Sequence, residues 1–317
     1  MGRYVIKRLL LLIPVIIGVS FIIYFLMDIA PGDIVVLKMG DDASLTEEQI
    51  QELYREYGLD KPLLVRYLRY MGRLVLGDLG QSQNTGERVI DMFSARIGST
   101  LKLAIASVIV SILISIPLGI VSAIHNGSVI DNAASFGTLL GLSIPNFWLG
   151  LVLIILFALN LHWLPSGGDD GSIKCLILPA ITIGTSLTAA LGRTTRSSML
   201  DVIRQDYLRT IRAKGAGERR VIWGHAFKNA MIPILTVAGE QFAGVLGGSA
   251  LTETVFAWPG TGRLLIDSIN ARDVPVVTGV LILKTLIASL IILTVDLLYA
   301  AVDPRVRAQF ARRRKSK

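Results

Sequence analysis

The sequence predicts an all-α integral membrane protein with six transmembrane helices. Its residues are 52% hydrophobic and only 18% charged, with a mean hydropathy of +0.59. The hydrophobic residues form long runs, each close to the roughly 20 residues that a helix needs to cross about 30 Å of hydrocarbon. Prolines inside several runs argue against central β-strands but are tolerated in membrane helices. The runs are residues 9–27, 103–124, 133–159, 175–192, 230–252 and 274–295.

The runs divide the chain into four expected parts. The first run has no small-residue cleavage site after it, so we expect an uncleaved first span rather than a secretory signal. Residues 1–27 are then an N-terminal tail and first transmembrane helix, and residues 28–98 an extracytoplasmic helical subdomain. Residues 99–302 form a five-helix transmembrane core with a cytoplasmic loop at 193–229, and residues 303–317 a basic cytoplasmic tail.

The placement of the lysines and arginines indicates how the chain is oriented in the membrane. Residues 1–8, 193–229 and 303–317 together hold 19 of the 32 lysines and arginines, whereas loops 160–175 and 252–273 hold few. Basic residues concentrate on the cytoplasmic side of membrane proteins, so both termini are expected to be cytoplasmic in a multi-pass protein of the inner or plasma membrane. The net charge of +8 therefore indicates contact with anionic membrane lipid, and no nucleic-acid partner is expected.

Segment 28–98 carries signals for two short helices. Thr46 and Gln49 form a capping-box pattern, and Gly58 is a natural stop. Between them, four residues recur at helical spacing: Ile50, Leu53, Tyr54 and Tyr57. A second helix is expected from Pro62, with its apolar residues on one face. These residues are Leu63, Leu64, Tyr67, Leu68 and Met71.

Segment 193–229 predicts a helix, a glycine turn and a second helix. Apolar residues recur every four positions and are interleaved with arginines, which is typical of a basic amphipathic helix. The apolar residues are Met199, Ile203, Tyr207 and Ile211, and the arginines are Arg196, Arg204, Arg209 and Arg212. Gly215 and Gly217 then interrupt the pattern before a helix at 218–229. The pattern fits a protruding knob that contacts a partner as well as it fits a helix lying on the membrane.

Two charges and two glycine pairs lie inside the spans. Glu240 and Lys284 should face protein or water, because a charge in hydrocarbon costs on the order of 3 kcal/mol. They either line a translocation path, pair with each other, or form a structural ion pair elsewhere. Glycines four residues apart permit close helix crossing, for static packing or for a moving gate. The pairs are Gly137 with Gly141 and Gly244 with Gly248.

Several classes of site have no signal in this sequence. It contains no G-x-x-x-x-G-K-[ST] phosphate loop, so no nucleotide-binding motif for ATP hydrolysis is present. Cys175 is the only cysteine, and the three histidines are scattered without metal-ligand spacing, so no metal site is expected. No catalytic residues are predicted, because the spans hold no nucleophile and base pair. A stand-alone secondary transporter that uses ions through Glu240 and Lys284 remains open at this point.

The loop motif resembles that of a known family. Residues 206–215 (DYLRTIRAKG) followed by 225–233 (HAFKNAMIP) are similar to the cytoplasmic coupling loop of ABC importer permeases, in the variant of the dipeptide, oligopeptide and nickel permeases. Arg209, Thr210 and Ile211 stand where the general importer motif has Glu-Ala-Ala. The ordered segments GDLGQS (77–82), SIPNFWLG (143–150), WLPSGG (163–168) and ETVFAWPG (253–260) also resemble this branch, as do APGD (30–33) and DPR (303–305).

This resemblance implies a function and a set of partners. It implies the type I ABC importer permease fold and the longer permease chain, which would form the path for short peptides with a second permease as a heterodimer. It also implies two ABC ATPase subunits, which would bind ATP and Mg, and an extracytoplasmic substrate-binding protein; this chain would bind no cofactor. Nickel or another small solute is an alternative cargo. The expected ATPase-coupling residues are Arg209, Thr210, Arg212, Ala213, Lys214, Gly215 and Ala216.

Overall fold

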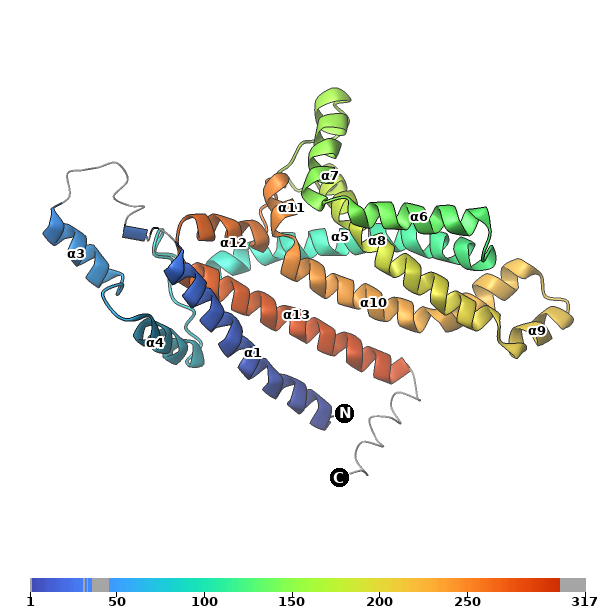
Figure 1. Cartoon of the computed structure of the whole chain (residues 1–317), viewed down its shortest axis with the longest axis horizontal. Coiled ribbons are helices and arrows are strands. Elements are labelled where there is room, and N and C mark those ends of the chain that lie inside the picture. The colour runs from blue at the N-terminus through green and yellow to red at the C-terminus, as the bar shows by residue number, and fades with distance from the viewer. Residues whose placement is uncertain (1, 31, 33, 36–45, 303–317) are drawn as a thin grey trace.

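The computed structural model describes residues 2–30, 32, 34–35 and 46–302, and these residues are predominantly helical (Figure 1). The predicted basic tail at 303–317 and part of the 30–33 motif lie outside them. The helices are α1 (Gly2–Ile29), α3 (Glu47–Glu56), α4 (Leu63–Val75), α5 (Val89–Ile124), α6 (Val129–Ser143), α7 (Asn146–Leu153), η1 (Ile154–Asn160), α8 (Ile173–Ile203), α9 (Asp206–Ala213), η2 (Arg220–Ala226), α10 (Phe227–Gly248), α11 (Ala250–Val255), α12 (Thr261–Asn270) and α13 (Val274–Val302).

Five segments are long and apolar enough to cross a membrane: Tyr4–Ile29, Val89–Ile124, Ile173–Ile203, Arg220–Gly248 and Val274–Leu297. Val129–Gly141 and Asn146–Asn160 together give a sixth candidate, so the prediction of six spans holds when this pair is counted as one. Helices α5, α8, α10 and α13 form the body of the bundle, and α9 lies at the end opposite to α3 and α12 (Figure 1). The all-α fold class is confirmed for the described residues.

The predicted span over 133–159 is not one continuous helix. The two halves of this segment meet at 93°. The break lies at Ile144, whose φ of −84° and ψ of 122° are extended, and Pro145 follows as the cap of α7. The proline ring disfavours the helical conformation of the residue before it, and proline has no N–H to continue the hydrogen-bond ladder. The segment therefore bends where its sequence reads Ile-Pro.

Helices α5 and α8 approach each other closely along a line of small residues. A methyl group at Gly119 of α5 would lie 2.6 Å from Cβ of Thr195 on α8. A methyl group at Gly184 of α8 would lie 2.8 Å from the backbone oxygen of Ser107 on α5. Without a hydrophobic driving force between helices in lipid, such close contact supplies the van der Waals attraction that holds a helix pair together.

The glycine pairs predicted from the sequence do not form this line. Gly141 packs against Thr185 of α8, where an added methyl group would lie 3.3 Å from the threonine side chain. Apart from the adjacent backbone of their own helices, no atom of the described chain lies within 4 Å of the position that a methyl group would take at Gly137, Gly244 or Gly248. The role of these three glycines in helix packing stays a prediction. It would require contact with another subunit.

The outer segment contains both predicted short helices. Thr46 caps α3 through its side chain, and the Gln49 side chain bonds back to the Thr46 backbone, so the predicted capping box is confirmed. Helix α4 begins after Pro62, as predicted. Its packed face differs from the expected one: Tyr67 and Tyr70 are buried against Tyr24 of α1. The prediction fails for Leu64 and Leu68, which are 58% and 60% exposed on the outer side of the helix.

Helix α5 begins at Val89, well before the first residue of the predicted run at 103, and so extends into the expected outer subdomain. The turn before α5 is held to the start of α13 by Asp273. This carboxylate accepts hydrogen bonds from the Ser82 hydroxyl at 2.5 Å and from the Asn84 side-chain amide at 3.3 Å. The same carboxylate accepts from the backbone N–H of Val276 and so caps α13. The outer segment is thereby fixed to the membrane core.

The contact between α5 and α8 gives a first prediction. Gly119→Ala is expected to destabilise the chain by about 1–3 kcal/mol, because the added methyl group overlaps Thr195. Gly244→Ala is the matched control, since it adds the same atom to a helix where nothing approaches, and alanine favours helix by about 1 kcal/mol over glycine. Thermal unfolding of the full-length chain in detergent compares the two. Equal unfolding midpoints would contradict the close packing.

Candidate functional site

The segment between α8 and α10, residues 204–226, forms a short protruding knob. The expected single helix through Met199 and Ile211 is wrong, because α8 ends at Ile203 and α9 begins at Asp206. The expected second helix at 218–229 is present: it is the π-helix η2 over Arg220–Ala226, which continues directly into α10 at Phe227. Residues 204–205 therefore turn the chain and allow α9 to lie at an angle to α8.

Gly215 ends α9 in the manner that the sequence predicts. Its φ is +84°, a left-handed conformation that glycine adopts without strain. The N–H of Gly215 bonds to the oxygen of Arg212 at 2.9 Å, and the N–H of Ala216 bonds to the oxygen of Ile211 at 3.4 Å. These two bonds form a Schellman motif, which satisfies carbonyl groups at the end of the helix. The turn that closes the knob is therefore defined by backbone geometry.

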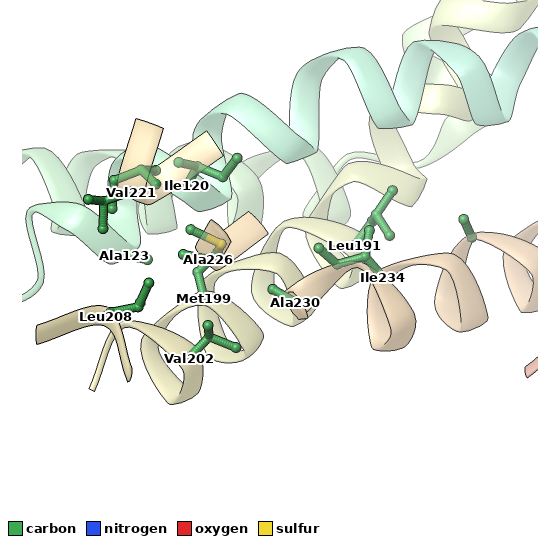
Figure 2. Close-up of a cluster of buried hydrophobic side chains, with 12 residues drawn as sticks. Ile120, Ala123, Leu191, Met199, Val202, Leu208, Val221, Ala226, Ala230 and Ile234 are labelled. Carbon is green, nitrogen blue, oxygen red and sulfur yellow. The ribbon is translucent and has the colours of Figure 1, made fainter. Parts of the chain in front are cut away.

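The knob rests on an apolar core that reaches three membrane helices. Leu208 of α9 and Val221 of η2 are fully buried, as is Met199 of α8. Figure 2 shows these side chains together with Ile120 and Ala123, which come from α5. Close packing of this kind transmits displacement because interiors have little free space. A force on α9 would therefore reach α5, α8 and α10 together.

The predicted coupling residues divide into an exposed set and a partly buried set. Arg209, Thr210, Ala213, Lys214 and Gly215 are exposed, and the Arg209 side chain is 79% accessible. The other two, Arg212 and Ala216, are partly buried. The exposed residues form a surface of small and basic side chains at the tip of the knob. Arg212 and Ala216 contribute to the internal structure of the knob.

Arg212 closes the turn through an ion pair. Its Nε and Nη2 atoms donate to the two carboxylate oxygens of Glu218 at 2.7 and 3.3 Å. Hydrogen bonding by the guanidinium lowers the pKa of Glu218 from its ordinary value. Because this pKa is lowered, the ion pair stabilises the folded chain at neutral pH. That stabilisation is lost as the pH falls through the pKa of Glu218 in the folded state. Arg212 thus shapes the knob rather than extending from it.

Arg196 has a different environment from the one that the sequence indicates. It was expected on the basic surface with Arg204, but it lies on α8 and turns toward the start of α6. Its Nε and Nη2 atoms each donate to a carboxylate oxygen of Asp131 at 2.7 Å. Asp131 also accepts from the Ser122 hydroxyl of α5. This nearly buried carboxylate joins α5, α6 and α8 close to the knob.

Glu240 and Lys284 lie in different environments. Glu240 is on the exposed side of α10, whereas Lys284 on α13 is only 4% exposed. The ion pairs among the described residues do not include one between them, and the Nζ atom of Lys284 has no hydrogen-bond partner there. The pairing alternative therefore has no support in this structure.

Glu253 is a buried charged residue that the sequence analysis did not single out. Its fully buried carboxylate accepts hydrogen bonds from the side chains of Thr100 and Ser249 at 3.2 and 2.7 Å. It also accepts from the backbone N–H groups of Gly262 and Arg263 at 2.7 and 3.0 Å. These N–H groups lie in the first turn of α12, where a negative charge is favoured by the helix dipole.

The sequence contains one weak indication of this carboxylate site. An acidic residue is followed by Gly260 and Gly262, and both glycines lie directly against the Glu253 carboxylate. A side chain at either position would displace it. Residues 252–273 were expected to form a loop between two spans, so a buried charge was not predicted there. The structure instead folds them into α11 and α12, packed on α5.

The buried carboxylate gives a second prediction. Glu253→Gln is expected to destabilise the chain by about 3 kcal/mol, because it removes the charge from a buried carboxylate that accepts four hydrogen bonds. Glu240→Gln, on the exposed side of α10, is the control and should change little. Thermal unfolding in detergent measures both variants. A midpoint for Glu253→Gln as high as that for Glu240→Gln would show that the buried carboxylate does not hold α11 and α12 in place.

Comparison with known proteins identifies the family. Residues 115–308 match the family described as the inner membrane component of binding-protein-dependent transport systems, and residues 1–104 match its N-terminal family. The oligopeptide transport system permease protein AppB of Bacillus subtilis is 40% identical over 96% of this chain and 99% of its own length. The glutathione transport system permease protein GsiC of Escherichia coli O6:H1 is 42% identical over 97% and 99%.

A solved structure agrees with the fold. A chain of the MetNI methionine ABC transporter in an inward-facing conformation superposes with a TM-score of 0.57 at 20% identity, covering 68% of this chain and 97% of that one. The predicted type I importer permease fold is thereby confirmed. The chain belongs to the family of inner membrane components of binding-protein-dependent transport systems, and it is an ABC importer permease.

Proposed function

We propose that this permease forms one side of the translocation path for short peptides. The observation that carries the proposal is identity of about 40% along almost the whole chain with permeases named for oligopeptide and dipeptide transport. The matched region includes the outer segment 28–98. Family membership also favours dependence on a binding protein over the stand-alone, ion-coupled transport that the sequence left open. No observation favours nickel as the cargo.

We infer a multi-subunit assembly. A second permease subunit would complete the path, two ABC ATPase subunits would bind ATP and Mg, and an extracytoplasmic substrate-binding protein would deliver the peptide. This chain lacks a phosphate-loop motif, which supports a transport subunit that is not itself an ATPase. Both termini are proposed to be cytoplasmic. In support, Tyr4 and Arg8 near the start of α1 both donate to Asp296 near the end of α13.

The tip of the knob is the proposed contact with an ATPase subunit. Arg209 and Lys214 supply positive charge, and Ala213 and Gly215 permit close approach of a partner backbone. Arg212 and Ala216 would act indirectly by holding the turn. ATP-driven movement of the partner would displace α9, and the apolar core beneath it would carry that movement into α5, α8 and α10.

Glu240 and Lys284 remain candidates for the translocation path. The exposed position of Glu240 on α10 supports contact with the path or with the second permease. Lys284 is buried within the bundle, which favours a structural role for it within this chain. A peptide carries an amine and a carboxylate, so one exposed acidic side chain beside the path would suit such a cargo.

The knob gives a third prediction. Ala213→Trp should prevent the ATPase subunit from binding while leaving the permease folded, because the bulky ring would keep the partner from the tip. Affinity purification of the tagged chain from its own host, with identification of co-purifying ATPases by mass spectrometry, measures this. Leu161→Trp, at an exposed position outside the knob, is the matched control. Undiminished ATPase recovery with Ala213→Trp would place the contact elsewhere.

Uptake by the reconstituted assembly tests the cargo. Proteoliposomes that contain the complete importer and its binding protein should accumulate a radiolabelled dipeptide only when ATP is supplied on the ATPase side. Unlabelled tripeptide should compete, and free amino acids and Ni²⁺ should not. ATP-dependent uptake of Ni²⁺ with no uptake of peptide would overturn the proposed cargo while leaving the importer assignment intact.

A further inference from the structure

An arginine-lined hollow lies on the outer part of the chain, between α3, α4 and the turn before α5. Its volume is about 600 Å³. Two acidic side chains, Glu56 and Asp78, are among its lining residues. Five arginines outnumber them: Arg55, Arg66, Arg69, Arg73 and Arg88. The excess positive charge inside a concave surface favours an anionic ligand.

Most of this charge is not neutralised by neighbouring carboxylates. Arg66 pairs with Asp28 at the end of α1, and Arg88 pairs with Asp91. The remaining three arginines form no ion pair with any described residue; they are Arg55, Arg69 and Arg73. Guanidinium groups bind phosphate and carboxylate oxygens in a planar, two-point geometry, so three of them around one hollow can hold an oxyanion.

A buried hydroxyl group in the hollow also has no partner. Tyr70 is only 6% exposed and lines the hollow, and its hydroxyl has no hydrogen-bond partner within the described chain. An unsatisfied buried donor costs roughly 1–3 kcal/mol, so such groups are normally paired with protein, water or ligand. Burial raises the pKa of the Tyr70 phenol, which therefore stays protonated and can donate to an anion.

Helix α4 packs against the membrane-spanning helix α1. The Tyr67 hydroxyl donates to the backbone oxygen of Ile17, inside the membrane-spanning helix α1, at 3.0 Å. The outward side of α4 is apolar, with Leu64 and Leu68 more than half exposed. A helix with one apolar face and one arginine-rich face lies in the interfacial region of a bilayer, where phospholipid headgroups are found.

We propose that this hollow binds a phosphate oxyanion, held by Arg55, Arg69 and Arg73 with the Tyr70 hydroxyl as a further donor. A phosphate group could come from a phospholipid headgroup or from free phosphate. The apolar outer face of α4 favours the lipid, because acyl chains can lie against Leu64 and Leu68 while the headgroup enters the hollow. The bound lipid would hold the outer segment against the membrane.

Binding of soluble short-chain lipids tests the proposal. The full-length chain, purified in a zwitterionic detergent with the subunits that accompany it, is titrated with dioctanoyl phosphatidylglycerol, dioctanoyl phosphatidylcholine and inorganic phosphate. The variants are Arg69→Gln with Arg73→Gln, and Tyr70→Phe, which removes only the hydroxyl. Lys174→Gln, an exposed cation near the start of α8, is the matched control. Thermal unfolding confirms that each variant is folded.

Phosphatidylglycerol is expected to bind about tenfold more tightly than phosphatidylcholine, whose cationic headgroup is repelled by the arginines. The double arginine variant should weaken phosphatidylglycerol binding by at least about tenfold and Tyr70→Phe by a few-fold, with no change for Lys174→Gln. Inorganic phosphate that binds as tightly as phosphatidylglycerol would support the oxyanion site and overturn the lipid as its source. Unchanged binding by the folded double variant would overturn the site itself, and equal binding of both lipids would overturn the expected preference for an anionic headgroup.

Discussion

The continuous packing from the knob into the membrane helices is the constraint on which the proposed mechanism depends. Small residues at Gly119 and Gly184 let α5 and α8 approach closely, and the same two helices contribute to the apolar core beneath α9. Leu208 and Val221 insert into that core without exposed surface. The knob is therefore part of the membrane domain, and a partner that moves it must move the helices that it contacts.

Buried polar contacts fix the remaining elements around this framework. At the outer end, Glu253 joins α11, α12 and α5 through charged hydrogen bonds, and Asp273 ties the outer turn to α13. Near the knob, Asp131 and Arg196 join α6 to α8. Such buried contacts are costly to break, because the polar groups would lose their partners in the protein interior. They limit movement to rearrangements that leave these pairs intact.

Features that depend on residues close together in the sequence, or on the need for apolar segments in a membrane, could be predicted from the sequence. Hydrophobic runs indicated the spans, the Thr46 capping box indicated α3, and Gly215 indicated the end of α9. Contacts between distant residues were not predictable in this way: Arg196 meets Asp131 across 65 positions, and nothing in its local pattern separates it from a surface arginine. The bend before Pro145 was missed because proline is compatible with both a continuous and a broken membrane helix.

The most direct test of the account is a distance measurement within the assembled importer. Spin labels at Gln205, the knob residue directly before α9, and at Leu113 on α5, both exposed, report whether the knob moves with the membrane helices. Double electron–electron resonance is recorded without nucleotide and with an ATP analogue that cannot be hydrolysed. If the apolar core transmits the movement, the distance between the labels stays constant in both states. A change of several ångströms in that distance would show that the knob moves independently and would contradict the account.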